Sequence, residues 1–250
     1  MNQYSFRRVM VPVAGWFSCS AIAGPPMATD DAGVLAQGGW EYTLAYEAEQ
    51  RDSGDSASAP SLEVAYGFND ELQGSVSIAR ATVDEPGSGS RSDFDAIGFE
   101  GKWQFYAQDN LSLAAVPSYS LPLTSSSTDR GIVDDVRVLS LPVVASWEQG
   151  AWTLGGQVAY EAASSGPNAW FGGIAGGYQA SEALKLLAEV YQTRTVGADE
   201  DETNWTLGVD VAVAEGLAFL ASVGGSLDSD LPDADELDQT WYLGFRYETR

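Results

Sequence analysis

The sequence predicts an all-β protein: a transmembrane up-and-down antiparallel β-barrel of about twelve strands. Three observations support this prediction. Apolar and polar residues alternate in segment after segment, each segment is about nine to 13 residues long, and short turns alternate along the chain with longer polar loops. A tilted strand needs about 9–11 residues to cross a bilayer, so the segment length fits a membrane-spanning strand. No run of about 18 uncharged apolar residues follows residue 23, which excludes a bundle of spanning helices.

The first 23 residues have the features of a cleaved secretory signal peptide. Two arginines precede the apolar run VMVPVAGWFSCSAIA, which ends in an A-x-A cleavage site before Gly24. The alternatives are an uncleaved anchor, a buried strand, or a lipoprotein signal that uses Cys19, although Trp16 and Phe17 are unlike the small residues of a lipobox. Cys19 is the single cysteine, so a cleaved chain would have no disulfide and no cysteine-bound metal. We expect residues 24–38 to form a short N-terminal periplasmic segment and residues 39–250 to form the barrel.

Each predicted strand has one apolar face and one polar face, because successive side chains of a strand point to opposite sides. In the first strand, the apolar face consists of Trp40, Tyr42, Leu44 and Tyr46, and the polar face of Glu41, Thr43 and Glu47. Either a protein core or lipid could cover the apolar face, and the barrel prediction favours lipid outside and a water-filled lumen inside. The predicted strands are 39–50, 60–68, 71–83, 94–106, 111–123, 136–147, 151–163, 169–180, 183–195, 203–214, 216–227 and 239–249.

The connections between these strands alternate in length. Short turns such as Asn69-Asp70, Gln149-Gly150 and Ser181-Glu182 alternate with mostly longer segments: QRDSGDSASA, DEPGSGSRSD, TSSSTDRGIVDD, SSGPN, VGADEDE and DSDLPDADELD. Outer-membrane barrels have this asymmetry, with short periplasmic turns and longer extracellular loops. Greek-key sandwiches do not require it. We therefore expect a barrel in the outer membrane of a Gram-negative bacterium, with aromatic residues near the strand ends forming interfacial girdles.

The formal net charge of −24 restricts the possible partners. A surface this acidic repels phosphate backbones, so we expect no nucleic acid, and cations or neutral small molecules are compatible. The acidic loops DSDLPDADELD and ADEDE offer oxygen ligands of the kind that Ca²⁺ and Mg²⁺ prefer. No D-x-D-x-[DN]-G loop is present, so a solvated loop is the simpler interpretation. Divalent bridging to lipopolysaccharide phosphates is the alternative.

Five segments together extend over nearly all of the chain after the leader and contain strand-turn patterns such as Tyr-Gly-x-x-Asp-x-Leu. They are DDAGVLAQGGWEYTLAYEAEQRD, AYGFNDELQGSVSIA, LSLAAVPSYSLPL, GGYQASEALKLLAEVY and DETNWTLGVDVAVAEGLAFLASVG. The chain thereby resembles the outer-membrane transporter-like family associated with the meta-pathway of phenol degradation. The resemblance implies a barrel that moves hydrophobic or aromatic molecules, without a catalytic residue. Such barrels commonly end in Phe or Trp as an assembly signal, whereas here Tyr247 stands three residues before the end.

The composition argues against an enzyme. The chain has no histidine, which excludes Ser-His and Asp-His pairs and any zinc site that needs imidazole. A carboxylate pair such as Glu41 and Glu63 on neighbouring strands could serve a glycosidase, but inward acids of a barrel more often line a pore. The glycine-rich stretch GGIAGGY (172–178) has no following helix, so we interpret it as a strand and not as a phosphate-binding loop. We expect neither catalysis nor a cofactor.

The inner wall of the barrel is the expected functional surface. The charged residues assigned to it are eight acids and three bases: Glu41, Glu47, Glu63, Glu100, Lys102, Glu161, Lys185, Glu189, Asp210, Arg246 and Glu248. Charged rings set the ion preference of a pore, so an open lumen would favour cations. Alternatively, the opposite charges pair and close the channel, as in small barrels filled by their own side chains.

The favoured function is a channel or transporter for small solutes, either hydrophobic and aromatic molecules or cations. The alternative is a structural or adhesive outer-membrane barrel that transports nothing, and a soluble periplasmic β-protein is a third possibility. The expected partners are outer-membrane lipid and lipopolysaccharide, small-molecule solutes and the barrel-assembly machinery.

Overall fold

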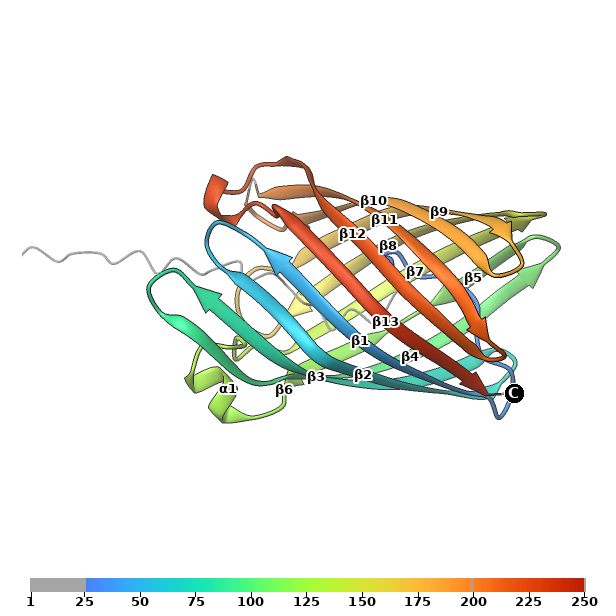
Figure 1. The fold of residues 1–250 in the computed structure, drawn as a ribbon, viewed down its shortest axis with the longest axis horizontal. Coiled ribbons are helices and arrows are strands. Elements are labelled where there is room, and N and C mark those ends of the chain that lie inside the picture. Colours follow the sequence, from blue (N-terminus) through green and yellow to red (C-terminus); the bar gives the residue numbers. More distant parts are fainter. Residues whose placement is uncertain (1–25, 199, 250) are drawn as a thin grey trace, which may run out of the picture.

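The computed structural model describes residues 26–198 and 200–249, which form a closed antiparallel β-barrel (Figure 1). The predicted signal peptide, residues 1–23, lies outside the described residues. The strands are β1 (Trp40–Gln50), β2 (Asp55–Asn69), β3 (Leu72–Glu85), β4 (Gly89–Gln108), β5 (Leu111–Ala115), β6 (Ser118–Pro122), β7 (Val138–Gln149), β8 (Trp152–Ala163), β9 (Ala169–Ser181), β10 (Leu184–Thr195), β11 (Asp201–Ala214), β12 (Leu217–Ser229) and β13 (Gln239–Thr249). Because β5 and β6 together make one crossing, the barrel has the twelve crossings that the sequence predicts.

The barrel closes between its first and last strands. β1 pairs with β13 along its whole length, with Trp40 opposite Thr249 and Gln50 opposite Gln239. On the other side, β3 pairs with β4, and β7 pairs with both β5 and β6. Closure gives every described strand a neighbour on each side, which satisfies backbone amides that hydrocarbon could not hydrogen-bond.

The crossing predicted for residues 111–123 is broken at Val116 and Pro117. Proline has no N–H to give to the ladder, so a regular strand cannot continue through it. Hydrogen bonds connect the break to both neighbouring strands. The Val116 amide donates to the Pro142 carbonyl of β7 at 3.0 Å, and the Gly101 amide of β4 donates to the Pro117 carbonyl at 3.0 Å. The wall therefore remains continuous at the break.

The two ends of the barrel differ as the sequence predicts. Five two-residue turns (70–71, 109–110, 150–151, 182–183 and 215–216) lie at the end that holds the C-terminus, and the longer loops lie at the other end (Figure 1). Gly150 and Gly216 have φ values of 61° and 71°, the left-handed geometry that tight hairpin turns require. β2 begins at Asp55, inside the predicted loop QRDSGDSASA, and DEPGSGSRSD is not a long loop either. β3 and β4 extend into it, with Glu85 opposite Gly89 and an Arg91–Glu85 ion pair of 2.7 Å.

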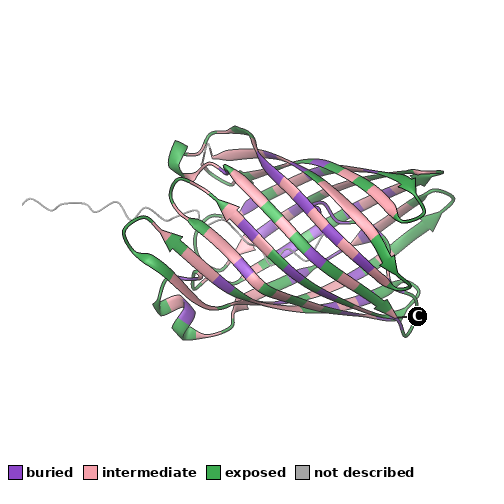
Figure 2. Cartoon of the chain, viewed as in Figure 1, coloured by how far each residue is buried: buried purple, intermediate pink, exposed green. Residues whose placement is uncertain are grey.

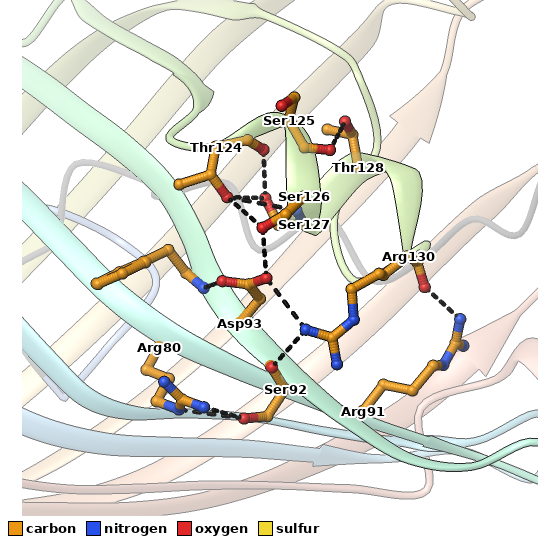
Figure 3. Close-up of polar contacts among 11 residues, drawn as sticks. Arg80, Arg91, Ser92, Asp93, Thr124, Ser125, Ser126, Ser127, Thr128 and Arg130 are labelled. Carbon is orange, nitrogen blue, oxygen red and sulfur yellow. Dashed lines mark hydrogen bonds and ion pairs between the residues drawn. The ribbon is translucent and has the colours of Figure 1, made fainter.

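The loop after β6 contains a short helix, α1 (Ser125–Asp129), that the sequence did not predict. Thr124 caps the helix, because its side chain accepts a hydrogen bond from the Ser127 amide. Asp93 of β4 holds it in place by accepting from Ser126 Oγ at 2.6 Å and pairing with Arg130 at 3.1 Å (Figure 3). These contacts tie the longest loop to the rim of the barrel.

Apolar and polar residues separate onto opposite faces of the wall, and bands of exposed and buried residues alternate along the strands (Figure 2). Trp40, Tyr42, Leu44 and Tyr46 are exposed on the outside, whereas Thr43 is buried on the inside. This is the apolar-out, polar-in pattern of membrane barrels. Among the described residues, no helix is both long enough and apolar enough to cross a membrane.

Candidate functional site

Residues 26–37, which we call the inner segment, lie inside the barrel. Their hydrogen-bond partners belong to six strands around the sheet: β3, β4, β7, β8, β10 and β12. A single short segment can reach all six strands only from the enclosed side of a closed sheet. The sequence predicted a short N-terminal periplasmic segment for residues 24–38, and the structure describes this stretch from residue 26 onward.

Glu189 of β10 binds the start of the inner segment through both carboxylate oxygens. Its Oε1 accepts from the Ala28 amide at 2.7 Å, and its Oε2 accepts from the Thr29 amide at 2.8 Å. Only 4% of Glu189 is exposed, so these two amides supply hydrogen bonds that water cannot easily provide. Nearby, Ser222 Oγ donates to the Pro26 carbonyl at 2.9 Å.

Asp30 and Lys102 form the buried ion pair of the lumen. Lys102 Nζ lies 2.8 Å from Asp30 Oδ1, and the two residues are 5% and 3% exposed, respectively. Burial raises the pKa of the Asp30 carboxyl to about 7, although the neighbouring Lys102 ammonium opposes the shift. The Asp30 amide also donates to Gln157 Oε1 at 2.7 Å, so the wall holds this residue by both its side chain and its main chain.

The middle of the inner segment packs closely against the wall. Ala32 is fully buried in a small apolar cluster with Ala114, Val116 and Val144. Its main chain is held as well: the Ala32 amide donates to Ser146 Oγ at 2.9 Å, and Gln104 Nε2 donates to the Ala32 carbonyl at 2.7 Å. The lumen therefore recognises the inner segment mostly through main-chain atoms.

Two glycines of the wall make room for the inner segment. A Cβ at Gly173 of β9 would collide with Thr29 Oγ1, and a Cβ at Gly67 of β2 would collide with the Ala36 carbonyl. By contrast, a Cβ at Gly172, which points outward, would meet nothing within 4 Å. Small residues at the first two positions thus serve the contact between wall and segment.

Six of the charged residues that the sequence assigned to the lumen form two groups, one around Arg246 and one around Lys102. Arg246 lies 2.8 Å from Asp210 and 3.8 Å from Glu41, joining strands β13, β11 and β1. Glu63 and Glu100 lie close enough to Asp30 and Lys102 to interact with them electrostatically. Both groups sit on the polar face of the wall.

The other predicted lumen residues are more dispersed. Glu161 is buried on β8, Lys185 lies beside Gly177 near the short-turn end, and Glu248 is exposed close to the C-terminus. Glu47 lies on β1 near Tyr242. The structure does not bring these four residues together into one cluster.

The acidic loops do not form a cation site in the part of the chain that the structure describes. No three Asp or Glu side chains converge there as metal ligands. Glu202 instead pairs with Arg51 at 3.3 Å and accepts from the Leu237 amide at 2.9 Å. Asp201 faces Arg194 at 3.6 Å.

Sequence reasoning missed the polar residues that bind the inner segment. These are Asp30 itself and the wall residues Gln73, Gln104, Ser146, Gln157 and Ser222. Each of these wall residues stands at a position that the alternation of its strand assigns to the inside. The pattern of a single strand does not indicate which inward residues contact the inner segment. The close-approach glycines were a signal, since Gly67 and Gly173 stand on inward positions where a side chain would be expected.

The fold is similar to those of several solved structures. The chain is similar to the COG4313 outer membrane channel from Pseudomonas putida F1, with a TM-score of 0.71 and 14% identity over 88% of this chain and 98% of that one. It is also similar to the NanC porin (TM-score 0.60, 8% identity, 83% and 98% covered) and to the KdgM porin in complex with disordered oligogalacturonate (TM-score 0.57, 9% identity, 83% and 99% covered). No family model and no curated protein matches the chain. The fold is therefore that of outer-membrane channel and porin barrels.

Proposed function

We propose that the protein is an outer-membrane channel for small solutes and that its lumen favours cations over anions. The observation that carries the proposal is the excess of carboxylates on the inner wall of a closed barrel. Glu47, Glu63 and Glu100 have no Lys or Arg nitrogen within 4.0 Å among the described residues. Negative groups in a confined, low-dielectric passage attract cations and repel anions.

Reversal potentials in planar bilayers test the ion preference. Under a KCl gradient, we expect a potential that favours K⁺, and the double variant Glu63→Gln/Glu100→Gln should shift it toward zero. Glu182→Gln is the matched control, because Glu182 lies in a short turn at the rim and not on the inner wall. A wild-type potential that favours chloride would overturn the cation preference.

Solute flux separates a channel from a structural or adhesive barrel. The resemblance to the phenol meta-pathway proteins favours aromatic or hydrophobic solutes, and this association stays a prediction. Liposomes that contain the purified protein should swell in small solutes, and comparing aromatic, aliphatic and sugar solutes of similar size gives the preference. Liposomes that do not swell in any of them would favour the structural role.

A further inference from the structure

The inner segment is bound in a way that allows it to leave. None of its residues joins the β-ladders of the barrel, and its contacts are made by single side chains of the wall. Two of the contacts involve charged groups, the Glu189 carboxylate and the Asp30–Lys102 pair, and the others join neutral partners that water can replace. The strands, in contrast, could leave only by breaking ladders in hydrocarbon.

The inner segment also has a pivot at its C-terminal end. Gly38 has a φ of 81°, and its amide donates to the Gly67 carbonyl at 2.9 Å. The Gly67 amide in turn donates to the Gly39 carbonyl at 3.0 Å, which fixes the pivot to β2 at the short-turn rim. Two adjacent glycines here allow the backbone to change direction with little steric hindrance. The inner segment can therefore swing while β1 stays in place.

The hydrogen bonds of Glu189 indicate which solutes could bind to the wall if the inner segment left. Its two oxygens receive two adjacent N–H groups, both of them neutral amides. A guanidinium ion presents two parallel N–H donors to a carboxylate in the same bidentate way and adds a positive charge. The hydrogen bonds from the two amides are already strengthened by the charge of the carboxylate, and a guanidinium adds a full positive charge on the donor side, so such a cation is a favourable competitor for Glu189.

We propose that the inner segment is a gate that occupies the solute-binding groups of the channel. It leaves by rotation about Gly38 and Gly39, and the vacated Glu189 then binds cationic solutes that carry paired N–H donors, of which guanidinium is the simplest. This inference rests on the proposed channel function and names the class of solute that the lumen holds. The Ala28 and Thr29 amides thus occupy the position on Glu189 that the N–H groups of the solute would take.

A disulfide between the inner segment and the wall tests the movement. A Cβ at Gly173 would overlap Thr29 Oγ1, which brings the Cβ atoms of a Thr29→Cys/Gly173→Cys pair near the separation of about 3.5–4.5 Å that a disulfide needs. In a Cys19→Ser background, we expect the oxidised protein to conduct at least several-fold less than the same protein after reduction. The two single-cysteine variants should not respond to the reductant. Equal conductance before and after reduction, in a protein that conducts after reduction, would overturn the gate.

A variant that weakens the binding of the inner segment tests the gate even if the wild-type barrel stays closed. Glu189→Ala removes the acceptor of two segment amides, so it should raise the conductance several-fold above wild type. An unchanged conductance in Glu189→Ala, together with an unresponsive disulfide variant, would mean that the inner segment does not control passage. If no variant passes ions at all, the channel function itself is overturned along with the gate.

Guanidinium and tetramethylammonium separate the solute class from simple charge. Both are monovalent cations, but tetramethylammonium has no N–H donor. We expect guanidinium to reduce the K⁺ current at concentrations at least tenfold below those needed for tetramethylammonium, and Glu189→Gln to abolish the difference. Equal inhibition by the two cations would overturn the binding role of Glu189. The disulfide and Glu189→Ala experiments would then still decide whether the inner segment is a gate.

Discussion

Asp30 and Lys102, 72 residues apart in the sequence, form an ion pair of 2.8 Å inside the barrel. The pair connects the inner segment to β4 and is almost fully buried. Breaking a buried pair by removing one partner leaves a charge without compensation, whereas replacing both partners removes the difficulty. The position of the inner segment should therefore depend on both residues together.

Lys102→Met should loosen the inner segment. Removing one partner of a buried pair costs about 3–5 kcal/mol, an upper limit here because Asp30 can take up a proton instead. We expect faster hydrogen exchange at the Ala28 and Thr29 amides. The double variant Asp30→Asn/Lys102→Met should restore much of the protection. Lys185→Met is the control, since Lys185 has no carboxylate within 4.0 Å among the described residues. A Lys185 variant that loosens the segment equally would contradict this reasoning.

Binding of the inner segment should weaken as the pH rises. The pKa of Asp30 is about 7 in the lumen and returns toward its ordinary value of 3.8 when the segment leaves. Between these two values the bound form carries a proton that the released form lacks. The binding of the segment is therefore strongest below about pH 3.8, weakens as the pH rises, and reaches its lower limit above about pH 7. The charged groups around Asp30 are Lys102, Asp31, Glu100 and Glu63.

Exchange rates corrected for intrinsic pH effects measure this linkage. From about pH 5 to pH 6.5, the equilibrium for segment binding should fall by up to roughly tenfold per pH unit. Asp30→Asn should lose most of this dependence. Protection that increases with pH in the wild-type protein would show that another group controls the equilibrium.

Gly173→Ala should displace the inner segment without harming the barrel. The added methyl group would collide with Thr29 Oγ1, and overpacking of this kind costs about 1–3 kcal/mol. Gly172→Ala is a matched control one residue away, because its methyl group would point outward into open space. Exchange at the Thr29 amide should rise in the first variant and stay unchanged in the second, with both barrels migrating as folded protein on detergent gels. Equal exchange in the two variants would contradict the close contact.

Asp93→Asn should free α1 from the rim. The change removes the ion pair with Arg130 and weakens the acceptor for Ser126 Oγ. Hydrogen exchange should rise over residues 125–130 and stay unchanged in the inner segment, which lies elsewhere in the barrel. Asp129→Asn, in the same helix, is the comparison. Faster exchange in both variants alike would indicate that α1 depends on loop charge and not on its contact with Asp93.

The sequence by itself determined the barrel. Alternation with period two assigned Trp40, Tyr42, Leu44 and Tyr46 to the outside because lipid and water impose opposite requirements on successive residues of one strand. The parity of turns and loops predicted the twelve crossings and placed the start of β1 and the end of β13 at the same end of the barrel. These are local signals, and each strand carries its own.

The tertiary structure alone decided what fills the lumen. Residues 26–37 have no regular alternation, and they mix apolar residues such as Met27 and Leu35 with Thr29, Asp30 and Asp31, so nothing in their sequence indicates a place in the lumen. They lie inside because Glu189, Gln157, Ser146 and Lys102, on four different strands, converge there once the barrel closes. Closure fixes which inward residues face one another across the lumen, and no pattern within a single strand contains that information.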